Sequence, residues 1–329
     1  MYLSFLLRRA TTINWCDIGQ VTIDILPDDV LLDIFDYFVT EADEDEAYEE
    51  WHILAHVCQK WRYIVFQSPL RLNLRILCSA RTRVREKLAL WPPLPIIVQQ
   101  YGPTSKCGED NIIAALLHSD RVCEIDLDIP SLLLKNIFSA MQKTFMALKG
   151  LQLGTIDDMA PIVFDSFLGG SAQHLQHLSL NHIPFSSPVL RELLLSAANL
   201  VVLSFSKVPH TAYFSPEQMV TFLPASTRLE VLCIEFESPR SRPPRESRRL
   251  SPLTRSVLPA LTVLRFVGAS EYLEDLVARI DAPLLDELDI TFFHQLLFNT
   301  PHLVQFTSRT QSSRPLTKHV CYFPIHARL

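Results

Sequence analysis

The spacing of hydrophobic positions predicts a helix near the start of the chain. From residue 29 to residue 38 nearly every position is large and apolar, and the exceptions Asp29, Asp33 and Asp36 fall on one stripe of a helix. Pro27, just before them, favours a helix start because proline fits the first helical turn. A surface helix normally buries one apolar face and exposes the rest. This helix has more apolar surface than one neighbour covers, so its other face has to be covered either by another part of this chain or by a second protein.

A second helical period follows an acidic stretch. Seven of the ten residues from Glu41 to Glu50 are acidic, which is typical of a solvated loop. Apolar side chains then recur every three or four positions from Leu54 to Val65, which predicts one amphipathic helix. We therefore expect a helical domain over residues 24–72, with an acidic insertion at 41–50 and a flexible leader over residues 1–23.

A six-residue unit of the form apolar-x-x-apolar-x-apolar repeats through much of the remaining chain. Successive clear copies lie 24 to 32 residues apart. The copies start at Leu148, Leu175, Leu200, Leu229, Leu261 and Leu285, with weaker copies at Val122 (VCEIDL) and Leu303 (LVQF). This period matches that of leucine-rich repeats, in which each copy is a short strand and the segment up to the next copy supplies a helix. The first, fourth and sixth side chains of each unit would then share a continuous core between parallel strands.

The predicted fold class is therefore α/β, with a short helical domain followed by a solenoid of parallel strands that alternate with helices. A connecting helix and a first degenerate repeat are expected over residues 73–121. The repeats cover residues 122–308. A Pro/Ser/Arg-rich loop at 237–257 interrupts them, and its composition does not suit a packed core. Residues 309–329 lack the repeat pattern and are predicted to form an irregular tail.

The positions between the buried ones in each unit are predicted to face outward. They would line the concave face of the solenoid, which is a usual binding surface for a target protein. These positions are Asp126, Gln152, His177, Ser179, Ser204, Cys233, Arg265, Glu287 and Asp289. The set mixes small, basic and acidic groups, so it does not specify a class of target by itself.

Composition narrows the function classes. The chain has 329 residues with a net charge of −6, which argues against nucleic acid as the main partner because phosphate binding needs a basic surface. No apolar run approaches the roughly 18 residues of a membrane helix, so no membrane association is expected. Seven scattered cysteines without a C-x-x-C pair, and a start without a signal-peptide pattern, indicate reduced thiols in the cytoplasm or nucleus.

The sequence offers little catalytic chemistry. It has no Gly-rich phosphate loop and no G-x-S-x-G motif. His52 and His56 have the spacing of a zinc pair, but the glutamate that accompanies such a pair in metalloproteases is missing. His174, His177 and His182 are not joined by cysteines or an acidic cluster. We therefore expect no catalytic residue, no metal and no cofactor, and a chain that is not an enzyme.

The two predicted helices together resemble an F-box. ILPDDVLLDIFDYF and LAHVCQKWRYIVFQSP carry its pattern in order, and the acidic insertion between them departs from it. With the repeats, the chain is similar to the large F-box families of mushroom-forming fungi, in which VC..WR.I....P.L and WP.LP often recur. The residues that match the family's docking helices are Leu26, Pro27, Leu31, Ile34, Phe35, Val57, Cys58 and Trp61.

The resemblance implies a non-catalytic bridge in ubiquitin conjugation. The matching residues would bind the small SKP-family adaptor of an SCF-type cullin–RING ubiquitin ligase, and through it the cullin scaffold. The repeats would hold a target protein, so the chain would be a substrate-recognition subunit. The alternative is a leucine-rich-repeat interaction scaffold outside any ligase, in which both faces of the first helix pack inside this chain. Coexpression with the adaptor distinguishes the two.

Overall fold

The chain divides into two compact units in the computed structural model. Their limits are Met1–Leu72 and Asn73–Leu329, the same position at which the predicted helical domain ends. The described residues are 25–40, 51–67, 74–79, 82–90, 93–100, 106–155, 157, 167–185, 187–223, 227–243, 255–293, 300–310 and 317–321. The predicted leader, the acidic insertion and most of the Arg-rich loop lie outside these residues.

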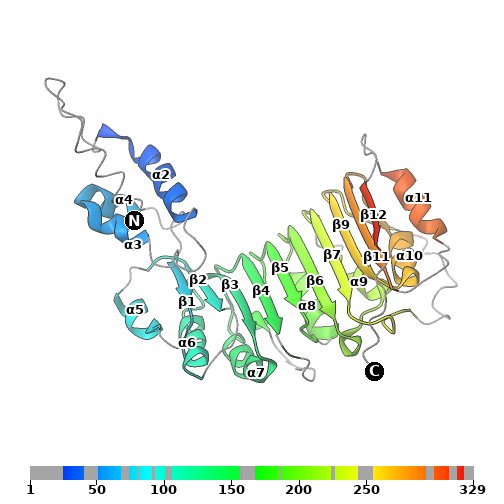
Figure 1. Ribbon diagram of the computed structural model, residues 1–329, viewed down its shortest axis with the longest axis horizontal. Coiled ribbons are helices and arrows are strands. Elements are labelled where there is room, and N and C mark those ends of the chain that lie inside the picture. Colours follow the sequence, from blue (N-terminus) through cyan, green and yellow to red (C-terminus); the bar gives the residue numbers. More distant parts are fainter. Residues whose placement is uncertain are drawn as a thin grey trace. The chain divides into compact units, whose positions relative to one another are not determined.

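The first unit contains three described helices, α2 (Asp28–Thr40), α3 (Trp51–Val57) and α4 (Gln59–Gln67) (Figure 1). The prediction of one continuous helix through Leu54–Val65 was wrong, because the helix breaks at Cys58. The Cys58 sulfur accepts a hydrogen bond from the backbone N–H of Trp61 at 3.4 Å, so its side chain caps the start of α4.

A small aromatic core joins α2 to α4. Leu31 and Phe35, one helical turn apart on α2, are both fully buried. The ring of Phe35 lies 4.8 Å from that of Trp61, measured between centroids. Lys60 adds a polar contact, because its ammonium donates a hydrogen bond to the backbone carbonyl of Leu26 at 2.9 Å. The start of α2 is therefore held to α4 by both apolar and polar contacts.

The second unit is built on one parallel sheet. Its ten described strands are hydrogen-bonded in the order β1-β2-β3-β4-β5-β6-β7-β9-β11-β12, and every neighbouring pair is parallel. The strands are β1 Leu74–Leu77, β2 Ile96–Gln100, β3 Val122–Ile129, β4 Gly150–Thr155, β5 His177–Asn181, β6 Val202–Val208, β7 Val231–Phe236, β9 Val263–Gly268, β11 Glu287–Phe292 and β12 Thr317–Cys321. Two further strands, β8 (Ser256–Val257) and β10 (Ile280–Asp281), pair with each other.

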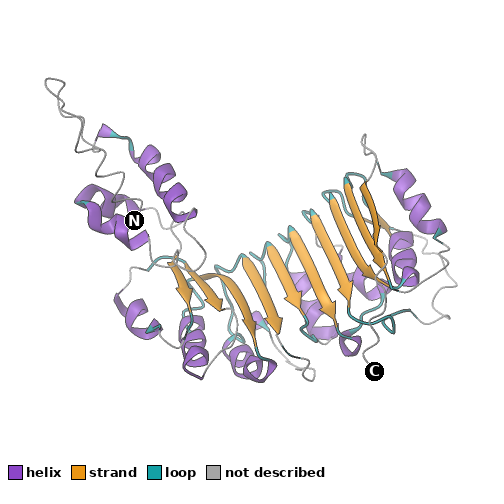
Figure 2. Ribbon diagram, in the orientation of Figure 1, coloured by secondary structure: helices purple, strands orange, loops and turns teal. Residues whose placement is uncertain are grey.

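Helices cover one face of this sheet, and the strands follow an arc whose inner side carries none of the described helices (Figures 1 and 2). The helices are α5 Val84–Leu90, α6 Lys106–Leu116, α7 Ser131–Ala140, α8 Ser187–Ser196, α9 Pro216–Phe222, α10 Ser270–Arg279 and α11 Pro301–Arg309, with short 3-10 turns η3 Leu168–Gly170 and η4 His210–Ala212. This solenoid-like arrangement confirms the predicted α/β class, in which parallel strands alternate with helices.

The six-residue units explain the core. In the unit that starts at Leu175, the first, fourth and sixth side chains, Leu175, Leu178 and Leu180, are at most 3% exposed. Between them, His177 is exposed and Ser179 is partly exposed. The other units follow the same alternation, because each strand turns one side toward the helices and the other away from them.

Three local predictions were wrong or incomplete. The weak copy at Leu303 is part of α11, because Leu303 and Phe306 have a spacing that a helix also uses. The tail is not irregular throughout, since Thr317–Cys321 form β12 beside β11. Strand β2 went unrecognised because all five of its residues are buried, so it lacks the polar–apolar alternation of the later strands.

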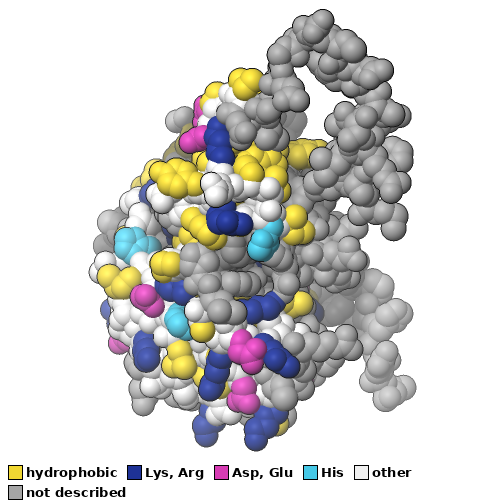
Figure 3. All heavy atoms as spheres, turned by 90° about the vertical axis from the view of Figure 1, so that its left-hand side faces the viewer, with side chains coloured by type: hydrophobic (Ala, Val, Ile, Leu, Met, Phe, Trp, Pro, Cys, Tyr) yellow, Lys and Arg dark blue, Asp and Glu magenta, His cyan; other side chains and the backbone are white. Residues whose placement is uncertain are grey.

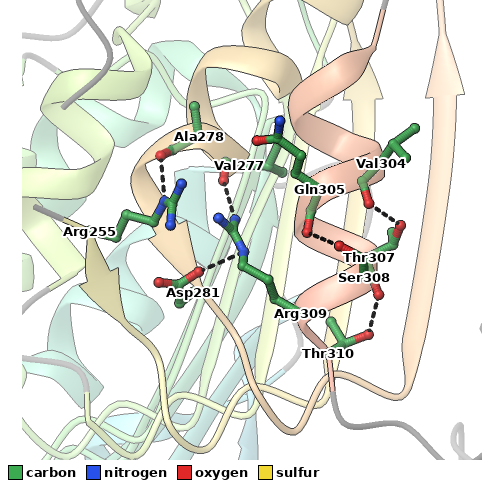
Figure 4. Close-up of polar contacts among 10 residues, drawn as sticks. All are labelled: Arg255, Val277, Ala278, Asp281, Val304, Gln305, Thr307, Ser308, Arg309 and Thr310. Atoms are coloured by element: carbon green, nitrogen blue, oxygen red, sulfur yellow. Dashed lines mark hydrogen bonds and ion pairs between the residues drawn. The ribbon is translucent and has the colours of Figure 1, made fainter. Parts of the chain in front are cut away.

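Two arginines, one near the end of the Arg-rich loop and one at the end of the last described helix, make polar contacts with α10 and β10 (Figure 4). Arg255, where the described chain resumes after the loop, donates to the carbonyl of Ala278 at 3.1 Å. Arg309, at the end of α11, pairs with the carboxylate of Asp281 at 3.0 Å and donates to the carbonyl of Val277 at 3.5 Å. Both ends of this region are therefore held by charged side chains bonded to backbone or carboxylate oxygens.

Candidate functional site

The first unit exposes an unusual amount of apolar side chain. Ile34 is 43% exposed, Val57 52% and Tyr63 63%, although all three lie on helices of a very small unit. We call the full set the apolar helical surface; it comprises Ile25, Val30, Ile34, Tyr37, Ile53, Val57, Tyr63 and Phe66. Figure 3 shows hydrophobic side chains gathered in the upper part of that view, where α2, α3 and α4 lie. Exposed apolar groups gathered in this way are typical of protein–protein interaction sites.

The residues predicted to bind an adaptor divide into three groups: core residues, surface residues and residues with mixed surroundings. Leu31 and Phe35 are fully buried and Trp61 is only 9% exposed, so these three side chains form the internal core described above. Their assignment as surface contacts is corrected, because the i, i+4 spacing that marks them as a stripe also turns that stripe toward α4. Ile34 and Val57 do lie at the surface.

The remaining predicted adaptor residues have mixed surroundings. Pro27 is exposed, whereas Leu26 and Cys58 are partly buried. Cys58 has the capping role at the start of α4, and Leu26 provides the carbonyl that Lys60 binds. These two positions therefore shape the unit rather than supply large apolar contacts.

Sequence reasoning did not single out several surface residues, although their spacing carried a signal. Val30, Ile34 and Tyr37 follow one another at intervals of four and three, which marks one side of α2. Tyr63 and Phe66 show the same relation on α4. A second helical stripe, offset from the Leu31–Phe35 stripe, would have identified them.

The second unit presents the face of its sheet that lacks helices; we call it the open sheet face. The residues predicted to bind a target lie on it in aligned rows. One row crosses seven neighbouring strands and contains Asp126, Gln152, Ser179, Ser204, Cys233, Arg265 and Asp289. His177 and Glu287 belong to the adjacent row, with Val202, Val231 and Val263 between them. Positions far apart in the sequence thus form one continuous surface.

Charge on this face is strongly negative. Six carboxylates from Glu124, Asp126, Asp128, Glu235, Glu287 and Asp289 stand against two guanidinium groups, Arg265 and Arg75, a net charge of −4 at these positions; Arg75 is on this side of the sheet because it is in register with Ile97, which is in register with Glu124. Arg265 donates two hydrogen bonds to one oxygen of Glu287, at 3.0 and 2.8 Å, and this contact raises the pKa of the guanidinium. Lys149, just before β4, and Lys207, at a bulge in β6, flank the face.

Cys233 lies near the centre of the open sheet face and could be mistaken for a nucleophile. Burial raises the pKa of its thiol, and nearby carboxylates from Glu287 and Asp289 act in the same direction, while Arg265 opposes them. A thiol with a raised pKa stays protonated at neutral pH and is a poor nucleophile. The raised pKa thus favours a small, weakly polar contact at this position over nucleophilic chemistry.

The three histidines noted in the sequence do not come together as a ligand set. His182 lies at the end of β5, where its ring faces Glu237 at 3.6 Å and the hydroxyl of Thr155 at 3.4 Å. Across the described residues, no group of three His, Cys, Asp or Glu side chains is arranged to hold a metal ion.

None of the described helices combines the length and apolarity that crossing a bilayer requires.

Comparison with known proteins gives no further identification. No family model matches the chain, and no curated protein sequence matches it at a significant level.

Proposed function

We propose that this chain is the substrate-recognition subunit of an SCF-type cullin–RING ubiquitin ligase. In this proposal the first unit is an F-box that binds an SKP-family adaptor through the apolar helical surface. The second unit is a leucine-rich-repeat solenoid that holds the target protein. The chain itself carries out no covalent step; it acts by raising the local concentration of the target near the ubiquitin-loaded enzyme.

One observation carries the proposal: the first unit has a filled core and a second, exposed apolar surface. Its core already contains Leu31, Phe35 and Trp61, so the exposed residues are not needed to fill it. Such residues reduce solubility unless a partner covers them. The F-box resemblance of the same helices supports an adaptor as that partner.

The magnitude is compatible with a specific complex. Fully burying a large apolar side chain is worth roughly 1.5–3 kcal/mol, so completing the burial of the eight side chains of this surface, which are about half exposed on average, gives roughly 6–12 kcal/mol. Association costs roughly 4–15 kcal/mol in lost freedom. Apolar contacts alone would therefore give marginal binding, and the acidic stripe of α2, with Asp29 and Asp33 exposed beside Ile34, has to contribute polar contacts.

Coexpression with the adaptor tests this function. The full chain, affinity-tagged, is expressed with an SKP-family adaptor, and a well-behaved F-box protein is purified in parallel. We expect the adaptor to co-purify in near-stoichiometric amount. Failure to co-purify while the parallel protein succeeds would leave the alternative, an interaction scaffold outside a ligase.

Matched variants test the surface itself. Ile34→Asp and Val57→Asp place a charge on exposed sides of α2 and α3, and we expect each to reduce adaptor recovery at least about tenfold, because an unpaired charge would be buried in the interface. Leu132→Asp, on α7 of the second unit, changes a residue that is 75% exposed and serves as the control. Equal losses in all three variants would refute the assignment of the surface.

A further inference from the structure

The open sheet face changes in chemistry along its length. Toward one end, β3 presents Glu124, Asp126 and Asp128 from alternate positions, and β2 and then β1, with Arg75 on the same side, continue the sheet beyond it. In the middle, Val202, Val231 and Val263 stand side by side on β6, β7 and β9, and all three are partly exposed, while Glu235 faces the same side four positions further along β7. At the other end, β11 presents Glu287 and Asp289. Two acidic ends thus enclose a short apolar centre.

Two glycines on β4 shape the acidic end. A Cβ at Gly150 would lie 3.0 Å from Cγ of Glu124, and a Cβ at Gly154 would lie 2.9 Å from Oδ1 of Asp128. Any other residue would press on these two side chains. The glycines therefore leave room for both carboxylates to lean over β4, which extends the acidic end toward β5.

Acceptor atoms without donors lie at the same place. Oδ1 of Asp128 and Oδ1 of Asn181 are buried and have no hydrogen-bond partner among the described residues. Gly154 lies between them in the register, with Cβ of Asn181 at 3.7 Å from the position of an added Cβ. Buried acceptors normally find a donor, so these two oxygens are positioned to accept N–H groups from a bound segment.

The other acidic end differs because its arginine is already engaged. Arg265 gives both of its described hydrogen bonds to Glu287, and Asp289 lies near enough to raise the pKa of the guanidinium as well, so Glu287, Asp289 and Arg265 together leave one net negative charge at this end. An anionic partner would meet carboxylates at both ends, which also disfavours a phosphate backbone. A cationic partner would meet complementary charge at both ends.

We propose that the open sheet face binds a cationic segment of the target protein, with Lys or Arg residues on both sides of a short apolar centre. This inference rests on the proposed function for the identity of the partner as a target, and on the face itself for its chemistry. The segment lies across the strands, with its apolar centre on the valine row. Neighbouring strands are about 4.8 Å apart, so the six steps from β3 to β11 span roughly 29 Å. That length fits about nine residues of extended chain.

Selection from a phage-displayed library of random 16-residue peptides on the immobilised full chain tests the proposal. We expect enriched peptides to carry two groups of Lys or Arg separated by Val, Ile or Leu. The most enriched peptide is then synthesised with a fluorophore, and its binding is measured by anisotropy. The triple variant Glu124→Gln, Asp126→Asn, Asp128→Asn should bind it about tenfold more weakly, because each exposed charge pair contributes up to several-fold.

A second triple variant provides the matched control. Asp110→Asn, Glu192→Gln and Glu217→Gln remove the same charge from exposed positions on α6, α8 and α9, away from the open sheet face. This variant should bind the peptide within about twofold of the original chain. Val231→Ser, in the middle of the valine row, should weaken binding without changing the net charge.

The outcomes separate this inference from the ligase proposal. This inference is overturned if no peptide is enriched, or if the enriched peptides are neutral, acidic, or cationic without an apolar centre. It is also overturned if both triple variants lose the same amount of peptide affinity. Adaptor co-purification is measured on the same triple variants and should not change. If the adaptor binds and the peptide result fails, only this inference falls; if the adaptor fails and the peptide result holds, only the ligase function falls.

Discussion

Truncation of Phe35 separates the internal core of the first unit from its surface. Phe35 is fully buried against Trp61, so Phe35→Ala should destabilise the unit by about 3–5 kcal/mol through lost burial and a cavity. A unit of its size has a total stability of only roughly 3–7 kcal/mol. We therefore expect α2 and α4 to open frequently in this variant, while the second unit, with its own core, stays folded.

Hydrogen exchange measured by mass spectrometry reports this directly. A loss of 3 kcal/mol corresponds to about a hundredfold faster exchange of amides in peptides covering residues 28–40 and 59–67, because each 1.4 kcal/mol is a factor of ten. Tyr37→Ala, a variant of a residue that is 63% exposed on the same helix, is the control and should change exchange less than about threefold. Unchanged protection in Phe35→Ala, or equal effects in both variants, would refute the division between core and surface.

Three further predictions concern the second unit. Gly268→Ala should lower the melting temperature more than Gly154→Ala, because the new methyl would lie 2.6 Å from an aromatic carbon in the core instead of 2.9 Å from the movable end of a carboxylate side chain; the reverse order in thermal unfolding would contradict this. Glu274→Ala should raise exchange in α11 alone, by about tenfold, since Glu274 accepts two backbone N–H groups at the start of that helix at 3.0 and 2.9 Å; unchanged exchange there would count against it. Burial raises the pKa of Cys78 from 9.0 to about 12, so the protonated thiol contributes its full stability below pH 9 and loses that contribution as the pH rises toward 12. Cys78→Ala should therefore reduce the fall in the free energy of unfolding between pH 9 and 12, measured by urea denaturation. An equal fall in the variant and the original chain would show that another group causes it.

The repeat was predictable from sequence because its physical constraint is local. A strand with one side against helices must place apolar side chains at fixed alternating positions, and Leu178 and Leu180 follow this rule as closely as Leu203 and Phe205. Parallel pairing then follows from a helix after each strand. The rule fails where both faces are covered, and for that reason β2, with five buried residues, had no recognisable pattern.

Helix boundaries in the first unit were less predictable. The apolar spacing from Leu54 to Val65 continues through Cys58, so periodicity alone indicates one helix. The break depends on one sulfur accepting a backbone N–H, which is a contact that periodicity does not report. The distinction between Phe35 as core and Ile34 as surface also depends on where α4 packs, and this is a tertiary property.

The chemistry of the open sheet face could be read in part from sequence. Each unit indicates which side chains point outward, and this placed Asp126 and Arg265 on one surface correctly. The register between strands decides which side chains are neighbours, and only this pairing brings Val202 beside Val231 and Gly154 beside Asp128. The acidic ends and apolar centre arise from this alignment across strands, so no single repeat contains the pattern.

The two proposed surfaces should respond differently to salt. The apolar helical surface combines burial, which added salt does not screen, with polar contacts from the acidic stripe of α2, whereas the open sheet face depends mainly on exposed charges that are screened beyond about 8–10 Å at physiological ionic strength. Raising sodium chloride from 50 to 300 mM should weaken peptide binding to the sheet face several-fold and weaken adaptor binding by a smaller factor. Both are measured on the same preparation of the full chain, by anisotropy and by co-purification respectively. Under the proposed function, such a bridge would stay bound to the ligase while its target exchanges, because charged contacts speed encounter more than they prolong the complex. Equal salt dependence at the two surfaces would show that one of them has been assigned the wrong driving force.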